Sequence, residues 1–382
     1  MADWGMGRDI FRVPHTNMTK YISLFSGIGA FECAVKDDPS FECVGYSEVD
    51  PHALQVYRKW YPEHRSLGDV RQLTDATARA LRPDLIVAGF PCTDLSSCKA
   101  LVSKKEKRGL RGGGRSALFV ELVRIIQACL EVNPKLDILV ENVASMKRCH
   151  RLYITSVLRH VLHKRVHRNV VCASHFSVQR RKRLFWTTWP LPDSKDDLSK
   201  PTSLKAPYFK NIVDHSDDAM SRYKYVYTRG ADVLNNMVKC SRGYRHSAKT
   251  KELPVVVRSK AKHGWYTTQH RVYTLHKHVE PKNRLVMDLH RSHTNQAKSK
   301  TLTTATNAAY IRHINTSDPH AYKFRYLTRA EMHRCFDFPI GYCSILVTRK
   351  RVHLVLANSI VVSVLNYITS SRSASSPSAG QP

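Results

Sequence analysis

Residues 84–92, with the sequence DLIVAGFPC, predict a short buried strand that ends abruptly at a cysteine. Pro91 stops the apolar run, so Cys92 is expected on a loop at the carboxyl end of the strand, the edge where open α/β sheets bind ligands. A Lys/Arg-rich and Gly-rich stretch follows, and cationic neighbours favour the thiolate form of a cysteine. Cys92 is therefore a candidate nucleophile, although a buried structural cysteine is the commoner outcome for such a residue taken alone.

Around this strand, the first half of the chain alternates strand-like and helix-like segments. Strands are expected at 21–25, 41–47, 85–88 and 138–140, and helices at 31–35, 53–60, 74–81 and 116–130. Such repeated βα units predict an α/β protein with a doubly wound, mostly parallel sheet.

The second half changes character near residue 190. Residues 193–300 combine strong positive charge, scattered aromatic side chains and weak periodicity, which predicts a smaller, loop-rich module. The expected divisions are an N-terminal extension (1–19), the first part of the main domain (20–192), this module (193–300), a return to the main domain (301–368) and a disordered tail (369–382).

The charge of the chain predicts a polyanionic partner. The 382 residues include 61 Lys and Arg against 31 Asp and Glu, a formal net charge of +30. Lys and Arg gain affinity by displacing counterions from phosphates, so nucleic acid is the first candidate and an anionic membrane the second. We find no run of about 18 apolar residues and no signal-peptide core, which predicts a soluble, intracellular protein. Ten scattered cysteines without a CxxC pair predict reduced thiols and no metal site.

Polar residues follow several of the expected strands. Gly27 and Gly29 lie at a strand–helix junction, where glycine lets the backbone approach a ligand closely, although a plain tight turn explains them equally well. Glu48 follows the second strand and could accept hydrogen bonds from ribose hydroxyls, and Asp69 could bind an adenine amino group. A helix cap or a solvated loop is the alternative for both acids.

Two further segments carry candidate catalytic groups. Glu141 directly follows the apolar run 138–140, and a carboxylate there is costly to bury without a function. If 179–183 (QRRKR) is a strand, Gln179, Arg181 and Arg183 share one face and could present guanidinium groups to a phosphate or a carbonyl. A solvated basic run or a localisation signal is the alternative.

Taken in order, these segments resemble the DNA (cytosine-5) methyltransferases, which use S-adenosylmethionine. The matching segments are LFSGIG at 24–29, Glu48 with Asp50, GDV at 68–70, GFPC at 89–92, ENV at 141–143, QxRxR at 179–183 and the late helix within 325–339. The catalytic stretch PCTDLS at 91–96 looks most like the animal de novo branch. The resemblance implies a Rossmann-like class I methyltransferase fold with a target-recognition domain in 193–300.

The resemblance also implies roles for particular residues. Cys92 would attack C6 of a flipped cytosine, Glu141 would hold the ring N3 and share a proton, and Arg181 and Arg183 would position the base. Cofactor contacts are implied at Phe25, Gly27, Gly29, Glu48, Val49, Asp69, Val70, Pro91 and Asn358. Contacts to double-stranded DNA are implied at Lys104, Lys105, Arg108, Arg111, Arg115 and Gln179.

The chain departs from the family pattern at four places. Thr93 follows the cysteine where Gln or Asn is frequent, and Ala30 and Asp337 replace glycines. Ala357-Asn358 matches only part of the Gly-Asn segment that completes the cofactor pocket in the family.

Two alternatives to the DNA enzyme remain open. One is a tRNA cytosine-5 methyltransferase, although Cys335-Phe336-Asp337 only partly matches the Cys-Phe-Thr segment of that relative. The other is an inactive accessory protein that binds DNA or a partner methyltransferase, against which the retention of all four catalytic residues argues. Self-association is left open, and the expected location is the nucleus in a eukaryotic or viral setting and the cytoplasm otherwise.

Overall fold

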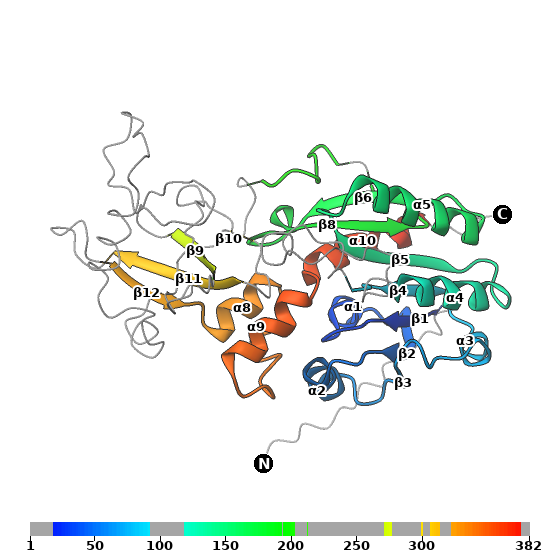
Figure 1. The fold of residues 1–382 in the computed structure, drawn as a ribbon, viewed down its shortest axis with the longest axis horizontal. Helices are drawn as coiled ribbons and strands as arrows, with labels where there is room; N and C mark the ends of the chain where they lie inside the picture. Colours follow the sequence, from blue (N-terminus) through cyan, green and yellow to red (C-terminus); the bar gives the residue numbers. More distant parts are fainter. Residues whose placement is uncertain are drawn as a thin grey trace, which may run out of the picture.

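The computed structural model describes residues 18–91, 118–192, 194–202, 212, 271–276, 299–300, 306–313 and 322–375. Within these residues the main domain is built on a seven-stranded sheet of order β3-β2-β1-β4-β5-β8-β6 (Figure 1). The strands are β1 (Thr19–Leu24), β2 (Phe41–Ser47), β3 (Ser66–Gly68), β4 (Leu85–Ala88), β5 (Asp137–Val143), β6 (His167–Cys172) and β8 (Lys182–Thr187). Only β8 runs antiparallel to its neighbours. The mixed, mostly parallel sheet confirms the predicted α/β class.

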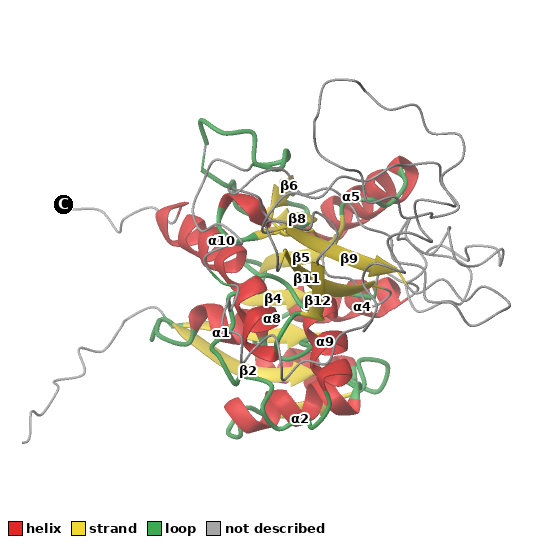
Figure 2. Cartoon of the chain, turned by 90° about the vertical axis from the view of Figure 1, so that its left-hand side faces the viewer, coloured by secondary structure: helices red, strands yellow, loops and turns green. Residues whose placement is uncertain are grey.

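Helices cover both faces of this sheet, as the turned view of Figure 2 shows. One layer contains α1 (Ala30–Val35), α2 (Pro51–Trp60) and α10 (Val362–Ser375), joined by α8 (Arg329–Cys335) and α9 (Arg349–Asn358). The other layer contains α3 (Asp75–Leu81), α4 (Phe119–Leu130) and α5 (Arg148–Leu162). A hydrophobic core lies between the sheet and each helix layer, and successive side chains along a strand point alternately into the two cores. In β4, Leu85 and Val87 belong to the first core cluster and Ile86 and Ala88 to the second.

Most predicted elements lie where expected, and their differences have local causes. The observed bounds of β2 and β4 match the prediction, whereas β5 continues to Val143, so Glu141 lies inside the strand. Helix α2 begins at Pro51, two residues before the predicted start, because the Asp50 side chain accepts hydrogen bonds from the backbone N–H groups of His52 and Ala53.

A second, smaller sheet lies beside the main domain in Figure 1. It pairs β9 (Arg271–His276), β11 (Thr306–His313) and β12 (Tyr322–Tyr326) in antiparallel fashion, while the short β10 (Ser299–Lys300) pairs with β7 (Gln179–Arg180). The division expected at residue 301 stays a prediction. β11 and β12 pair with each other and with β9 in this smaller sheet, and Leu327, directly after β12, belongs to the first core cluster of the main domain. Most of the predicted 193–300 module lies outside the described residues.

The C-terminal segment is also more ordered than predicted. A disordered tail was expected from residue 369, but α10 runs to Ser375. The hydroxyl groups of Thr369, Ser370 and Ser371 donate to carbonyls one turn earlier, which satisfies these polar side chains within the helix. The Arg372 guanidinium reaches Asp137 at 3.1 Å and so fastens the helix to β5.

One segment near the C-terminus of the described residues is strongly apolar. Residues 349–372 are long and apolar enough by composition to cross a membrane, and 67% of the apolar window is buried inside the protein. In the structure this segment forms α9 and α10, which pack in the first core cluster and against α1.

Candidate active site

The carboxyl ends of the parallel strands gather the predicted site residues at one edge of the sheet. Neighbouring β1 and β4 form the point where the strand order reverses, and open α/β sheets bind ligands outside such a point. Residues 25–29 follow β1, Glu48 follows β2, Asp69 follows β3, residues 89–91 follow β4, and Glu141 lies near the end of β5.

The glycine loop after β1 is tightly packed on one side and open on the other. Phe25, Gly27 and Gly29 all have positive φ, at 56°, 59° and 84°. A Cβ atom on Gly29 would lie 2.7 Å from Cε2 of Tyr61, so only glycine fits there. A Cβ atom on Gly27 would meet nothing within 4 Å, so the open side of the loop has room for a ligand.

Glu48 holds this loop in place. One carboxylate oxygen accepts a hydrogen bond from the Gly27 N–H at 2.8 Å, and the other accepts from the N–H groups of Val49 and Asp50 at 2.7 and 2.8 Å. The Val49 side chain beside it is 61% exposed. The Glu48 carboxylate, a hydrogen-bond acceptor, and the exposed apolar side chain of Val49 thus lie next to each other at the end of β2.

The third strand end supplies a second carboxylate. Asp69 accepts hydrogen bonds from the backbone N–H and the guanidinium of Arg71, and these bonds hold the pKa of the Asp69 carboxyl below its ordinary value. A ligand at Asp69 would share the carboxylate with Arg71. Val70 is only 3% exposed, and its side chain packs in the second core cluster, so a contact between Val70 and the cofactor stays a prediction.

Glu141 and Arg183 form a buried ion pair at the end of β5. Glu141 pairs with Phe185 and Arg183 with Val143 across the antiparallel strands, so the two charged side chains lie diagonally on one face. The Arg183 Nε is 2.9 Å from Glu141 Oε1, with both side chains less than 20% exposed. Burial raises the pKa of the Glu141 carboxyl above its ordinary value, while the positive charges of Arg183 and Arg181 oppose the rise.

The strand that leads to Cys92 passes directly beside this pair. A Cβ atom on Gly89 would lie 3.5 Å from the second carboxylate oxygen of Glu141. The Asn142 side chain donates to the Phe90 carbonyl at 3.0 Å and fixes the backbone two residues before Cys92. Asn142 has no predicted role of its own, and its place next to Glu141 in the ENV segment is the only signal in the sequence that points to it.

Several predicted residues lie outside the described part of the chain. They are Cys92 and Thr93, and the expected DNA contacts Lys104, Lys105, Arg108, Arg111 and Arg115.

Residues 179–183 do not form one continuous strand, because β7 ends at Arg180 and β8 begins at Lys182. Arg181 falls between β7 and β8 and is 2% exposed; it donates to the carbonyls of Ala357 and Ser359 at 2.7 and 2.8 Å. These two carbonyls flank Asn358, which is exposed. Gln179 is fully buried and donates to the Cys335 carbonyl.

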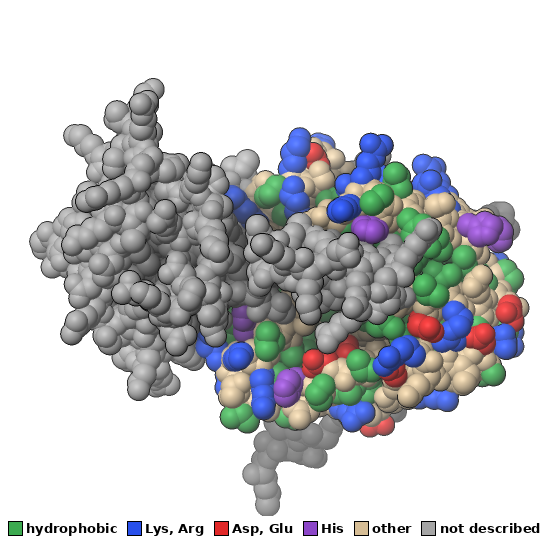
Figure 3. All heavy atoms as spheres, viewed as in Figure 1, with side chains coloured by type: hydrophobic (Ala, Val, Ile, Leu, Met, Phe, Trp, Pro, Cys, Tyr) green, Lys and Arg blue, Asp and Glu red, His purple; other side chains and the backbone are tan. Residues whose placement is uncertain are grey.

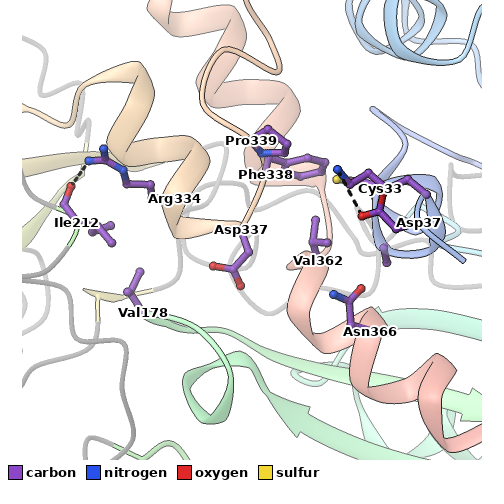
Figure 4. A pocket seen from close by; sticks show the side chains of 12 residues that line it. Cys33, Asp37, Val178, Ile212, Arg334, Asp337, Phe338, Pro339, Val362 and Asn366 are labelled. Carbon is purple, nitrogen blue, oxygen red and sulfur yellow. Dashed lines mark hydrogen bonds and ion pairs between the residues drawn. The ribbon is translucent and has the colours of Figure 1, made fainter. Parts of the chain in front are cut away.

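Asp337 shows how the chain accommodates a departure from the family pattern. Its φ of 59° lies in the left-handed region that glycine adopts easily. The carboxylate compensates by accepting hydrogen bonds from the hydroxyls of Ser177 and Ser363. Asp337 also lines an open pocket of about 480 Å³ between α1, the turn after α8 and α10 (Figure 4). Among the residues that the structure describes, none of the predicted cofactor or catalytic residues lines this pocket.

The surface beyond the active site is rich in positive charge. No acidic residue occurs from Asn142 to Pro192. Exposed basic side chains on α5, β6 and the adjoining turns are Lys147, Arg148, Arg159, Arg165 and Arg168. Figure 3 shows Lys and Arg side chains, in blue, along the upper edge of the main domain. Such a surface favours contact with a polyanion.

Comparison with known proteins gives consistent matches. The profile of the family described as C-5 cytosine-specific DNA methylase matches residues 19–373. Type II methyltransferase M2.BsuMI of Bacillus subtilis is 32% identical over 220 residues, which are 55% of this chain and 52% of that protein. Type II methyltransferase M.NgoBV of Neisseria gonorrhoeae is 30% identical over 51% of this chain and 46% of its own length. The chain thus spans about half the length of these curated relatives.

Solved structures match over more of the chain but with lower identity. Dnmt2 methyltransferase of S. pombe is 16% identical, with a TM-score of 0.58 over 92% of this chain and 97% of that one. A DNMT2 mutant from Spodoptera frugiperda is 17% identical, with a TM-score of 0.57 over 92% and 99%. At this identity the likeness concerns the fold, and it agrees with the Rossmann-like methyltransferase architecture of the main domain.

Proposed function

The chain belongs to the C-5 cytosine-specific DNA methylase family, and from this membership we propose that it transfers a methyl group from S-adenosylmethionine to C5 of cytosine in double-stranded DNA. The observation that carries the proposal is the buried Glu141–Arg183 pair, with Gly89 of the GFPC segment beside it. An ionisable carboxyl group held in a partly desolvated place by a fixed guanidinium suits proton sharing with a bound base.

The proposed reaction depends on Cys92. Cytosine C5 is a poor nucleophile until the Cys92 sulfur donates an electron pair to C6, which makes C5 electron-rich. Glu141 would share its proton with the ring N3 as charge develops there, and Arg183 would hold the Glu141 carboxyl group in place. After methylation, loss of the C5 proton and departure of the thiolate would restore the aromatic ring. The base must leave the duplex to reach this site.

The strand ends fit S-adenosylmethionine, which supplies a methyl group made electrophilic by its sulfonium sulfur. The open space beside Gly27 admits a ligand against the backbone. A carboxylate has about four acceptor sites, and three backbone N–H groups use Glu48, so the carboxylate can still accept a ribose hydroxyl. Exposed Val49 would pack on the adenine ring, and Asp69 would accept from its amino group.

Arg181 has a supporting role in this proposal. Its hydrogen bonds to the carbonyls of Ala357 and Ser359 hold the segment that contains Asn358. By resemblance to the family, this segment would complete the cofactor pocket. Ala357-Asn358, which matches the family segment only in part, is thus held in position by the buried guanidinium of Arg181. The positive charge of Arg181 also acts on Glu141, so one side chain would support both the cofactor segment and the catalytic carboxyl group.

The basic surface supports DNA as the substrate. Lys and Arg groups on α5 and β6 and the positive charge of 193–300 would contact phosphates. Phosphate contacts position a duplex without reading its sequence, so base selection would fall to the smaller module.

The test is transfer of a labelled methyl group from S-adenosylmethionine to duplex DNA or to tRNA. We expect label on DNA with the wild-type protein and none with Cys92→Ser. If label is found on tRNA and not on DNA, the proposed DNA substrate is wrong and the protein is a tRNA methyltransferase. Absence of transfer to either nucleic acid, with tight and salt-sensitive DNA binding, would overturn the enzymatic proposal in favour of an accessory role.

A further inference from the structure

The loop between α8 and α9 reaches across the fold to the glycine loop. Tyr342, which is 1% exposed, donates its phenolic O–H to the Ile28 carbonyl at 2.9 Å. The two residues are 314 positions apart in the sequence. The Tyr342 oxygen also lies 3.4 Å from the Gly29 carbonyl and 3.2 Å from the Tyr61 hydroxyl. A side chain from the C-terminal part of the chain therefore meets the backbone of the loop after β1.

This contact lies on the packed side of the glycine loop. A Cβ atom on Gly29 would lie 3.2 Å from the Tyr342 oxygen as well as 2.7 Å from the Tyr61 ring, whereas Gly27 faces open space. The two tyrosines thus support the loop from one side, and the other side stays accessible. Because the Ile28 carbonyl is buried, the Tyr342 hydroxyl is the partner that keeps this peptide group in its observed orientation.

Tyr342 is itself held firmly. The indole of Trp60 stacks on its ring, with centroids 4.8 Å apart and planes 8° from parallel, and the indole N–H donates to the Tyr342 carbonyl at 2.8 Å. The Phe338 ring packs nearby at a centroid distance of 4.6 Å. A side chain fixed by packing against two rings can set the position of a backbone segment more accurately than a mobile one can.

We propose that Tyr342 is a positioning residue for cofactor binding, which acts by holding the Ile28 peptide so that the Gly27 side of the loop is shaped for the ligand. The inference rests on the proposed function, in which this loop binds S-adenosylmethionine. Loss of the hydroxyl leaves a buried carbonyl without its donor and lets the loop relax. Glu141 lies on a different strand end, so the chemical step keeps its geometry once the cofactor is bound.

The test is Tyr342→Phe in the full chain, with binding of S-adenosylmethionine measured by calorimetry and methyl transfer measured in parallel. The variant removes one oxygen and keeps both ring contacts. We expect the Kd for the cofactor to rise about 10-fold, the size expected for one lost buried hydrogen bond. KM for the cofactor should rise by the same factor, and kcat should stay within about twofold.

Tyr46→Phe is the matched control. Tyr46 is also 1% exposed, but its hydroxyl accepts a hydrogen bond from Arg58 on α2 and not from the glycine loop. We expect its cofactor Kd to stay within about twofold of the wild-type value. Trp60→Phe is a second, milder variant that keeps a ring beside Tyr342 and loses the indole N–H, so its Kd should rise by about threefold.

The outcomes separate the two levels of the proposal. Wild-type protein that binds no S-adenosylmethionine would overturn the proposed function itself. Wild-type binding with an unchanged Kd in Tyr342→Phe would overturn the role of Tyr342 alone. A fall in kcat without a change in Kd, or an equal loss of binding in Tyr46→Phe, would also contradict a positioning role.

Discussion

The Arg183 Nε lies 2.9 Å from Glu141 Oε1, and this pair joins two antiparallel strands at the edge of the sheet where the loop to Cys92 begins. Burial raises the pKa of the Glu141 carboxyl group above its ordinary value in spite of the neighbouring guanidinium. A carboxyl group in this state can carry a proton at a pH where an exposed one would have lost it.

Glu141→Gln should therefore abolish most of the activity. We expect methyl transfer to fall by about 10²–10⁴-fold, the usual contribution of a positioned acid–base group. The amide cannot exchange a proton with the base, but it keeps the shape of the side chain. Single-turnover transfer with saturating cofactor measures the effect, and cofactor binding by the variant is the control. A variant that keeps near wild-type transfer would remove Glu141 from the catalytic machinery.

Arg183→Met should shift the pH dependence of transfer. The wild-type rate is expected to fall as pH rises through the raised pKa of Glu141, because the proton is lost there. Removal of Arg183 takes away the charge that most opposes the rise, so this pKa should increase further. The falling limb should then move to higher pH, on a lower overall rate. A limb that moves to lower pH would contradict the assignment of the limb to Glu141.

Glu32→Gln should change how stability depends on pH. Glu32 is 2% exposed, and burial raises the pKa of its carboxyl group above the ordinary 4.5, with hydrogen bonds to the carboxyl opposing the rise. Its favourable contribution to stability is thus complete below pH 4.5 and is lost as pH rises through the folded-state pKa.

Thermal unfolding measured across that pH range checks this. The Tm of the wild-type protein should fall relative to that of Glu32→Gln as pH rises. The exposed Glu63→Gln is the control and should show no such divergence. Parallel Tm curves for the wild type and Glu32→Gln would contradict the prediction.

Alanine at the two loop glycines should have different effects. Gly29→Ala places a methyl group 2.7 Å from the Tyr61 ring at a φ of 84°, so it should lower stability by more than the about 1–2 kcal/mol cost of a left-handed residue alone. Gly27→Ala meets no neighbour, and its methyl group enters the space assigned to the cofactor. We expect a smaller loss of Tm and a larger loss of cofactor affinity for Gly27→Ala. The reverse order of binding and stability effects would place the ligand elsewhere.

Asp337 offers a test of backbone strain. Asp337→Ala loses the bonds from Ser177 and Ser363 and keeps a positive φ, so it should lower the free energy of unfolding by about 2–4 kcal/mol. Asp337→Gly loses the same bonds but adopts this φ easily, and it should be more stable than the alanine variant by about 1 kcal/mol. Chemical denaturation measures both. Equal stabilities would indicate that no strain is stored at this position.

The sequence by itself located four of the seven strands of the main sheet and the order of its strand-end residues. Strands such as 85–88 are short apolar runs closed by Gly and Pro, and their side chains cover both faces of a sheet, so local pattern and alternation suffice to locate them. Parallel strands then bring their carboxyl ends to one edge, which is why residues 27, 48, 69 and 141 could be grouped without a structure.

Only the tertiary structure decided what each side chain contacts. The QRRKR segment has the alternation of a strand, yet Arg181 and Gln179 donate to backbone carbonyls more than 150 positions away, whereas Arg183 forms an ion pair with Glu141. Likewise, nothing near Tyr342 in the sequence marks it as the partner of Ile28. Local preference is set by neighbours along the chain, whereas these contacts depend on how distant elements pack, and the burial that follows fixes both their partners and the pKa of Glu141.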